Sequence, residues 1–420
     1  MRDRARHAEN TLVTIISRAA IYDPVVPRVL LTFEPPDGGV AEHVLQLARA
    51  LPERGFEVEL AGPLEADFVY GQLDPAIKVH RIAFQRGYGD PKADLKSAVQ
   101  LSRVVKRGRY DLVHAHSAKA GVVARSVLAG RKPPVIYSPH CFPFIGDFGN
   151  GRRIFATTVE RMLAPTTARI LCVCDDERQE GLRVGIKHRR MRVIHNGSKA
   201  LPPATEPLAE LEAFRGEDGV LVGSVAVLRE QKRVDVLIDA APSILASDPR
   251  ARVAIIGNGP LQAELRARAT SLGLLGEDRF AFFPFQPPAF GALAALDVYV
   301  LPSSWEAFPI GVLEAMATGI PQVATDVGGT REAVVDGYGR ASHRTEPDAP
   351  QGTEIEGETG LLVPPADHRA LAAAVNELVP DARRRQAMAD ASRERHAERF
   401  TLSKMADGIA DAYREVLSGK

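Results

Sequence analysis

Short apolar runs alternate with amphipathic stretches along most of the 420-residue chain. The run RVLLTF at 28–33 precedes a segment at 38–56 in which Val40, Val44 and Leu47 recur at helical spacing, and the run EVELAG follows it. Strand, helix and strand in repetition predict parallel sheets joined by right-handed crossovers. Further strand candidates in this first series are YDLVHAH, PVIYSPH, ARILCVC and MRVIHNG.

A proline-rich passage near residue 200, KALPPATEPLAELEAF, interrupts the alternation. Such passages commonly join domains. The alternation then resumes with GVLVGSVAVL, RVAIIGNG, FAFFPF, LDVYVLPS and IPQVATD as strand candidates, and with predicted helices at 232–246, 260–272, 288–296 and 311–318. We therefore expect an α/β protein with two doubly wound Rossmann-like domains that face each other across a ligand-binding cleft.

The predicted organisation begins with an N-terminal extension at 1–27. A first domain follows at 28–199 and a second at 200–399. A helix at about 400–420 is assigned back to the first domain. The polar, turn-rich stretch at about 337–359 is predicted to be an insertion in the second domain, because a connection of that length is uncommon in a compact fold.

Charge is balanced overall, with 53 basic and 53 acidic residues, so no global field argues for nucleic acid as a partner. Residues 92–199 differ, with 21 Lys and Arg against 8 Asp and Glu. This basic stretch is either a solvated surface or a face for an anionic membrane or substrate. It contains Arg152, Arg153, Lys187, Arg189 and Arg190.

The sequence predicts a cytoplasmic protein. A peripheral contact with the inner face of the membrane is compatible with this prediction. The N-terminal basic residues precede a short apolar run without a clear cleavage pattern, so we expect no signal peptide. No stretch approaches the roughly 18 uninterrupted apolar residues of a spanning helix. The three cysteines, Cys141, Cys172 and Cys174, lack Cys-x-x-Cys spacing and are expected to be free thiols.

Glu306 and Glu314 stand on either side of a predicted strand-to-helix turn in SSWEAFPIGVLEAMATG. The first backbone N–H groups of such a helix point out of its N-terminus, where a phosphate binds well. A carboxylate beside that position suits sugar hydroxyls, so Glu314 could hold a ribose and Glu306 a second sugar. Two sugars joined by a diphosphate make a nucleotide sugar. Alternatively, Glu314 only favours the helix N-terminus and Glu306 is a solvated loop residue.

The pair also resembles the Glu-x7-Glu signature of glycosyltransferase family 4, whose members are retaining enzymes with the GT-B fold. The resemblance extends over nearly the whole chain and in the family's order. It rests on GGVAEHVLQLARALPERGFEVELAG, YDLVHAHSAKAGVVAR, SPHCFPF, VIHNGSK, LREQKRVDVLIDAA, IIGNGP, the Glu306 to Glu314 stretch with AMATGIPQVATDVGGTREAV, and GETGLLVPP.

The resemblance implies a role for each matching residue. His140 would contact the transferred sugar, Lys232 would neutralise the leaving diphosphate, and Glu306 completes the expected catalytic set together with Arg229. The expected donor-binding residues are Gly38, Gly39, Gly257, Gly259, Phe285, Phe308, Pro309, Ile310, Gly311 and Glu314.

The sequence departs from the family pattern at two positions. Val227 stands where relatives carry an arginine that assists the leaving phosphate, and Ala307 stands where many carry glycine. Arg229, two residues on, lies on the same face of an extended segment and could replace that arginine. Otherwise Lys232 and the helix N-terminus suffice, or catalysis is impaired.

The resemblance implies transfer of a sugar from a UDP- or GDP-sugar to an acceptor hydroxyl. A glycan or lipid-linked acceptor of envelope or exopolysaccharide assembly is expected, and a soluble acceptor stays open. No Asp-x-Asp site stands out, so neither a metal nor a cofactor is expected. Domain closure is expected, with hinges near residue 200 and at 395–405. The rival interpretations are a non-catalytic nucleotide-sugar binder, for which Val227 argues, and a nucleotide-sugar 2-epimerase.

Overall fold

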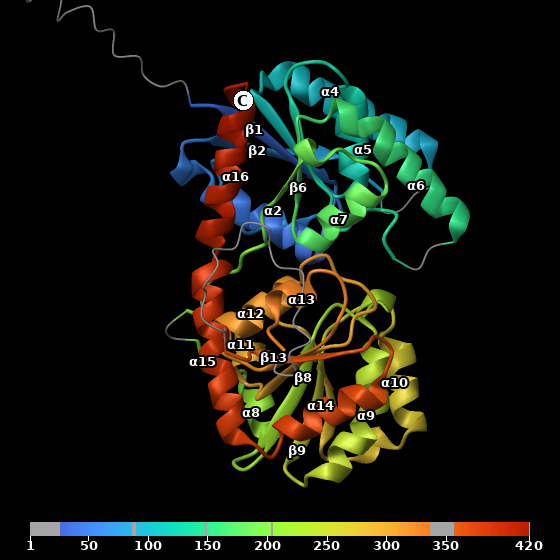
Figure 1. Ribbon diagram of the computed structural model, residues 1–420, viewed down its shortest axis with the longest axis vertical. Helices are drawn as coiled ribbons and strands as arrows, with labels where there is room; N and C mark the ends of the chain where they lie inside the picture. The colour runs from blue at the N-terminus through green and yellow to red at the C-terminus, as the bar shows by residue number, and fades with distance from the viewer. Residues whose placement is uncertain (1–25, 86–89, 147–148, 203–204, 337–356, 420) are drawn as a thin grey trace, which may run out of the picture.

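The computed structural model describes residues 26–85, 90–146, 149–202, 205–336 and 357–419. In these residues the chain forms two parallel sheets, of seven and six strands, stacked along the long axis of the molecule (Figure 1). Most of the predicted extension at 1–27 and of the predicted insertion at 337–359 lies outside the described residues.

The first sheet has the strand order β3-β2-β1-β4-β5-β6-β7, and every strand pair is parallel. The order reverses between β1 and β4, which opens a crevice at their carboxyl ends where ligands bind in doubly wound sheets. The strands are β1 (Arg28–Phe33), β2 (Glu57–Pro63), β3 (Val79–Ile82), β4 (Leu112–His116), β5 (Val135–Ser138), β6 (Arg169–Cys172) and β7 (Met191–Val193).

The second sheet repeats this plan in the order β10-β9-β8-β11-β12-β13, again with parallel pairs only. Its reversal lies between β8 and β11, so each half has its own crevice. The strands are β8 (Val220–Val225), β9 (Ala251–Ile256), β10 (Phe280–Phe283), β11 (Val298–Leu301), β12 (Gln322–Thr325) and β13 (Gly360–Val363).

Helices connect successive strands and cover both faces of each sheet (Figure 1). The first half contains α2 (Gly38–Ala50), α3 (Asp67–Tyr70), α4 (Pro91–Gly108), α5 (Ala118–Val127), α6 (Asn150–Leu163) and α7 (Asp175–Arg183). The second contains α8 (Ala209–Arg215), α9 (Val234–Ser247), α10 (Gln262–Ser271), α11 (Ala289–Ala294), α12 (Ile310–Thr318), α13 (Thr330–Ala333), α14 (His368–Leu378) and α15 (Ala382–Arg399), and the chain ends with α16 (Leu402–Leu417).

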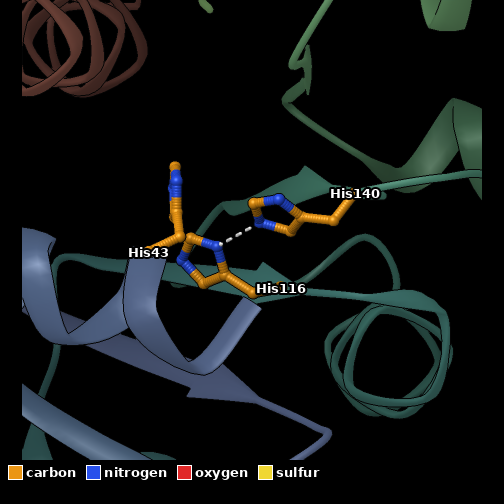
Figure 2. Close-up of side chains that lie close together, drawn as sticks. All are labelled: His43, His116 and His140. Carbon is orange, nitrogen blue, oxygen red and sulfur yellow. Dashed lines mark hydrogen bonds between the residues drawn. The ribbon is translucent and has the colours of Figure 1, made fainter. Parts of the chain in front are cut away.

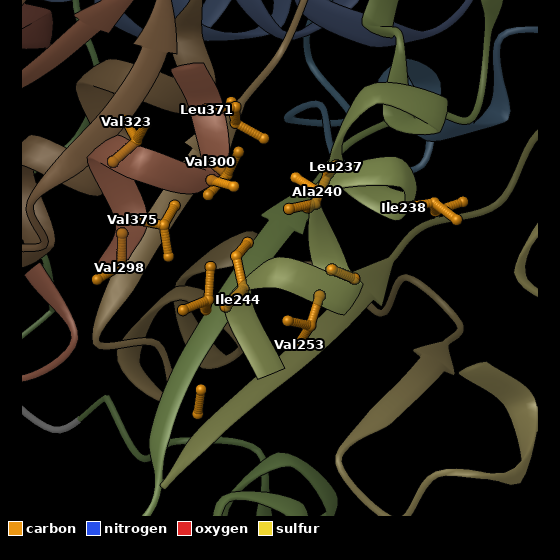
Figure 3. Close-up of a cluster of buried hydrophobic side chains, with 14 of the residues drawn as sticks. Leu237, Ile238, Ala240, Ile244, Val253, Val298, Val300, Val323, Leu371 and Val375 are labelled. Carbon is orange, nitrogen blue, oxygen red and sulfur yellow. The ribbon is translucent and has the colours of Figure 1, made fainter. Parts of the chain in front are cut away.

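Most strands of the two parallel sheets are buried on both faces, which explains why their sequences are continuous hydrophobic runs. In the second half, Ile244 of α9 and Val375 of α14 pack against Val253 and Val300 of the sheet, and all four are fully buried (Figure 3). A helix layer on each side of a buried sheet follows from this pattern.

The chain crosses between the halves twice, and the two crossings are paired. Ser198 N donates to the Phe400 carbonyl at 2.9 Å, and Leu402 N donates to the Ser198 carbonyl at 2.9 Å. A Cβ on Gly197 would lie 2.4 Å from the Thr401 carbonyl oxygen, so only glycine permits this approach. Beyond the crossing, α16 returns to the first half, where Tyr413 is fully buried (Figure 1).

The predicted fold class is confirmed, since both series of strands form doubly wound parallel sheets. The short strands β3 and β13 were not among the predicted strands. The domain limits drawn from the sequence stay a prediction. Among the described residues, no helix is both long and apolar enough to cross a membrane.

Candidate active site

A cavity of about 1060 Å³ lies where the carboxyl ends of the two sheets approach each other, and residues of both halves line it. Twelve of the fourteen site residues predicted from the sequence are part of its lining. The structure therefore brings together side chains that lie up to 276 positions apart, from Gly38 to Glu314.

The N-terminus of α12 opens into this cavity. No side chain caps it, and Phe308, Pro309, Ile310 and Gly311 line the cavity wall. The N–H groups of the first turn are thus directed at the cavity together with the positive end of the helix dipole. This is a suitable site for an anion such as a phosphate.

Gly38 and Gly39 face the start of α12 from the opposite wall. Gly38 has a φ of +75°, a conformation that glycine adopts without strain. A Cβ added to Gly39 would lie 3.9 Å from Ile310 Cδ1, so the two N-terminal helix turns, α2 and α12, approach each other across the cavity. Because residues 38–39 carry no side chains, the backbone of this turn lines the cavity directly.

Glu306 forms an ion pair with Lys232 inside the cavity. Lys232 Nζ donates to Glu306 Oε1 at 2.5 Å, and Ser303 Oγ donates to the same oxygen at 2.7 Å. The Glu306 side chain is only 8% exposed, so the pair is fixed by burial as well as by charge. A bound diphosphate at this point would share the ammonium with Glu306.

The turn that carries Glu306 rests on two further glycines. A Cβ on Gly328 would lie 1.8 Å from the Glu306 carbonyl oxygen, and a Cβ on Gly329 would lie 2.1 Å from that of Ala307. Gly329 N also donates to the Ala307 carbonyl at 2.8 Å. The segment at 327–329 therefore holds the backbone of the glutamate turn, and neither glycine tolerates a side chain.

Glu314 lies one turn into α12 and is half-buried. Burial, together with the nearby carboxylate of Glu42 on α2, raises the pKa of Glu314 to about 8. Both carboxyl groups line the cavity. Near neutral pH, Glu314 can therefore donate a hydrogen bond as well as accept one, which suits a pair of sugar hydroxyl groups.

His140 lines the cavity and lies in a cluster with His43 and His116 (Figure 2). His116 Nδ1 and His140 Nε2 form a hydrogen bond of 3.0 Å, and the His43 ring lies 4.6 Å from the His140 ring, centroid to centroid. Burial lowers the pKa of His43 to about 4 and holds the pKa values of His116 and His140 well below the usual value. The rings are thus neutral at physiological pH.

These three imidazoles are also a group that could ligate a metal ion. One ring nitrogen from each of His43, His116 and His140 lies within 4.8 Å of the others, and Nε2 of His116 has no hydrogen-bond partner among the described residues. Neutral imidazoles from separate elements are suitable ligands for a transition metal. The prediction that no metal takes part in the reaction stays a prediction.

The loop that presents His140 is strained and is held by Glu177. His140 and Cys141 have φ values of +55° and +104°, which is unusual for residues other than glycine. The buried Glu177 carboxylate accepts the N–H of Cys141 at 2.6 Å and the N–H of Val173 at 2.8 Å. Burial raises the pKa of Glu177 to about 7. Glu177 positions His140 although it does not line the cavity.

Arg229 reaches across the cavity to the first half. Its Nη2 donates to Asp37 Oδ1 and Oδ2 at 2.9 and 2.8 Å, and Asp37 is the residue before α2. Val227 lines the cavity and presents an apolar surface where relatives are expected to carry arginine. Arg229 is therefore in the cavity, and its partner here is a carboxylate of the opposite half.

Gly257 and Gly259 are the two predicted donor-binding residues that do not line the cavity. A Cβ on Gly257 would lie 2.0 Å from the Ala226 carbonyl oxygen, and one on Gly259 would lie 2.5 Å from that of Leu228. Both glycines allow the 226–228 loop to pack closely behind the cavity wall. Asn258, between them, does line the cavity and donates to the Phe285 carbonyl at 3.5 Å.

Sequence reasoning missed several residues that shape the site. Tyr299 lines the cavity with a buried hydroxyl that has no hydrogen-bond partner among the described residues. Asn196 Nδ2 donates to the Phe308 carbonyl at 2.9 Å and so ties the first half to the glutamate turn. Tyr299 resembles a core strand residue in sequence, while the Asn196 contact spans 112 positions and left no local signal.

Two family models match the chain, one in each half. The model described as Glycosyltransferase Family 4 matches residues 37–198, and the model described as Glycosyl transferases group 1 matches residues 212–395. The chain belongs to glycosyltransferase family 4. It is therefore an enzyme that uses a nucleotide-sugar donor, and the cavity of this family 4 enzyme lies between its two sheets.

Two relatives are more than 25% identical to this family 4 enzyme over the aligned residues. The Escherichia coli UDP-Gal:alpha-D-GlcNAc-diphosphoundecaprenol alpha-1,3-galactosyltransferase is 27% identical, over 69% of this chain and 77% of that protein. The D-inositol 3-phosphate glycosyltransferase of Rhodococcus jostii is 28% identical, over 90% of this chain and 84% of that protein.

Solved structures confirm the GT-B fold of the family 4 enzyme. The Anabaena protein HepE, solved in complex with UDP-glucose, superposes with a TM-score of 0.73 at 19% identity and covers 92% of this chain and 99% of its own. WaaG, described as a glycosyltransferase of lipopolysaccharide biosynthesis, superposes with a TM-score of 0.68 at 17% identity, over 92% of this chain and 99% of its own.

Proposed function

We propose that this enzyme transfers a hexose, with retention of anomeric configuration, from a UDP- or GDP-sugar to a hydroxyl group of a lipid-linked or envelope polysaccharide glycan. One observation carries the proposal. The uncapped N-terminus of α12 faces Gly38 and Gly39 across the cavity, with Lys232 beside it. A diphosphate fits between these groups, with a carboxyl group on each flank for a sugar.

The donor-side roles follow from the positions of the charged groups. The α12 N–H groups and Lys232 neutralise the charge that develops on the leaving diphosphate. Arg229 adds a second positive charge when it exchanges Asp37 for phosphate, which compensates for Val227. Glu314 holds the ribose, and Glu306 and His140 hold the transferred sugar.

In the proposed reaction, the bond between the anomeric carbon and the diphosphate breaks while the acceptor oxygen forms its bond on the same face of the sugar. The acceptor proton passes to the departing phosphate oxygen. The protein therefore contributes positioning and electrostatic stabilisation, without a covalent intermediate on a carboxylate.

The acceptor class is supported by one relative. The Escherichia coli relative is named for a diphosphoundecaprenol-linked acceptor. A lipid-linked acceptor would place the enzyme at the inner face of the membrane as a peripheral protein, next to the basic first half.

A screen of donors tests the proposal. We expect one UDP- or GDP-sugar to raise the melting temperature and to be hydrolysed slowly in the absence of acceptor. Lys232→Met should slow this hydrolysis by about 10²- to 10³-fold, the usual effect of removing one stabilising group from such a site. Lys404→Met, on the exposed side of α16, is the matched control and should not change the rate.

A nucleotide-sugar binder without transferase activity is the second candidate, because Val227 occupies the position of the expected arginine. The same screen separates the two. A donor that raises the melting temperature but is not hydrolysed, by the original protein or by Lys232→Met, would favour the binder. Turnover that depends on Lys232 would favour the transferase.

A further inference from the structure

Exposed apolar side chains gather on two helices of the first half. Among the described residues, nine large hydrophobic side chains are exposed, and five of them are on α4 or α6. Leu95 and Val99 on α4 are 67% and 41% exposed. Ile154, Phe155 and Met162 on α6 are 67%, 62% and 71% exposed.

On α6 these side chains form a stripe that points away from the core. Ile154, Thr158 and Met162 follow one another at intervals of four residues, so they lie in a row along the helix, and all three are exposed. Ala156 and Glu160, on the other side of the helix, are buried. The most outward positions of α6 are therefore largely apolar, the reverse of an ordinary surface helix.

The exposed charges around this stripe are positive. Both acidic side chains within α4 and α6 are ion-paired, since Asp94, whose side chain is 39% exposed, pairs with Lys119 at 2.6 Å and the buried Glu160 pairs with Arg125 at 2.8 Å. The exposed charged residues of the two helices are Lys92, Lys96, Arg103, Lys106 and Arg107 on α4 and Arg152, Arg153 and Arg161 on α6.

The two helices form one continuous surface, which we call the α4–α6 face. Helices α4, α5 and α6 lie side by side on the outer flank of the first half (Figure 1). Asp94 of α4 and Phe155 of α6 line the same small groove of about 190 Å³. At the far end of α6, a Cβ on Gly185 would lie 3.7 Å from Arg161 Nε, so the segment that continues to the exposed Lys187 passes beside this helix.

We propose that the α4–α6 face docks on an anionic lipid bilayer. Ile154, Phe155 and Met162 enter the interfacial region, and the surrounding lysines and arginines contact lipid phosphates. A bilayer fits better than an acidic protein, because the apolar side chains are on the outermost stripe and need a medium that they can enter. The inference rests on the proposed function insofar as a lipid-linked acceptor requires the enzyme at a membrane.

The position of the face relative to the cavity fits this role. α6 begins at Asn150, ten residues after His140 in the cavity wall. Docking through α6 would therefore act on the half of the molecule that contributes His140 to the cavity wall.

Sedimentation of the full-length protein with vesicles tests the proposal. We expect binding to phosphatidylcholine vesicles that contain roughly one third phosphatidylglycerol, and weaker binding as the salt concentration is raised to about 0.5 M. The triple substitution I154S/F155S/M162S should weaken binding by about tenfold or more, because it removes the apolar contribution. The double substitution K96E/R153E should weaken it by roughly thirtyfold, because it removes two positive charges and adds two negative ones.

The matched control is L272S/L275S, which removes two exposed leucines, each 43% exposed, from the second half. It should bind vesicles like the original protein. Absence of binding to anionic vesicles, equal binding to uncharged vesicles, or unchanged binding by both α4–α6 variants would overturn the proposal. The substituted residues are exposed, and melting temperatures confirm that each variant is folded.

The rise in melting temperature that UDP-sugars cause, measured on the same variants, separates this proposal from the proposed function. We expect equal protection in all of them, because none of the substituted residues lines the nucleotide-sugar cavity. Vesicle binding without donor protection would contradict the proposed function and support docking. Donor protection without vesicle binding would overturn docking alone.

Discussion

At the scale of single residues, the site combines groups whose protonation is set by burial. Glu314 keeps its proton to about pH 8, while His43 loses its proton at about pH 4. Lys232 and Glu306 instead hold each other in an ion pair at 2.5 Å. A nucleotide sugar in the cavity would thus meet the neutral imidazole of His140, a positive helix end and a carboxylic acid that can donate and accept hydrogen bonds.

Glu314 gives a prediction about pH. Its pKa is about 8 in the folded protein and near 4.5 in the unfolded chain, so the folded state binds more protons between these values. The unfolding free energy should therefore fall as the pH rises through this window. Glu314→Gln should show a smaller fall, measured by urea unfolding at intervals between pH 5 and 8.5. An identical pH dependence in the two proteins would contradict the raised pKa of Glu314.

Glu177 gives a prediction about positioning. In Glu177→Gln, the amide cannot accept both the Cys141 and Val173 N–H groups, so we expect a loss of about 1.5–3 kcal/mol in unfolding free energy. The transfer rate should fall as well, because the strained His140 loop is released. Glu180→Gln, on the same helix, is the control and should change stability by less than about 1 kcal/mol. Lost stability with a normal transfer rate would show that Glu177 does not position His140.

Twelve of the fourteen site residues predicted from the sequence line the cavity, because the glutamate pair and the glycine loop carry local signals. The contact partners of these residues could not be predicted. Ser303 is close to Glu306 in sequence, but Lys232 is 74 positions away, and nothing local indicates that it would pair with that carboxylate. Glu177 stands in DDERQE, where it reads as an acidic residue at a helix N-terminus. Gly257 and Gly259 read as ligand-binding glycines, whereas their close neighbours are backbone atoms of 226–228.

At the scale of secondary-structure elements, the alternation of apolar and amphipathic segments was sufficient to predict the two sheets. β3 and β13 have only four residues each, and β13 follows directly after the polar stretch, so their patterns are too short to stand out. The helices of the first half pack by their apolar sides and are also joined by ion pairs. α5 and α6 are joined by the fully buried pair Arg125 and Glu160, with the Arg125 guanidinium 3.8 Å above the Tyr137 ring.

That buried pair gives a prediction about stability. Arg125→Met leaves the Glu160 carboxylate buried without its partner, so the unfolding free energy should fall by about 3–5 kcal/mol. The double substitution R125M/E160L removes both charges and should recover most of the loss. Denaturant unfolding of the three proteins measures both effects. A double variant as unstable as Arg125→Met would mean that packing around α6, rather than the lone charge, determines the loss.

At the scale of the whole molecule, the cavity is shared between two halves that contact each other through polar groups and through apolar side chains such as Val173 and Phe308. Arg229 meets Asp37, Asn196 meets the Phe308 carbonyl, and the Glu332 carboxylate accepts the N–H groups of Asp175 and Asp176 at 2.8 Å each. Interfaces of this kind commonly separate and close again during turnover. Donor and acceptor sides would therefore meet only when these contacts form.

The molecule as a whole also allows a test of metal independence. Because Lys232 and the α12 N-terminus can neutralise the diphosphate, transfer should continue at the same rate after dialysis against EDTA. The measurement is the transfer rate with and without added Mg²⁺, Mn²⁺ or Zn²⁺, together with the metal content of the protein. A lost rate that only Zn²⁺ restores would contradict the prediction and point to His43, His116 and His140 as ligands.

The pairing of Ser198 with Thr401 has a consequence for how product leaves. The two backbone segments that join the halves are held together by hydrogen bonds at this pairing, so they can act as a hinge about which the halves rotate. Rotation about this hinge would open the cavity on its opposite side without breaking the hydrogen bonds of either sheet. The residence time of the nucleotide product would then depend on these few hydrogen bonds, which lie away from the reacting atoms. A side chain at Gly197 would alter turnover without contacting the sugar.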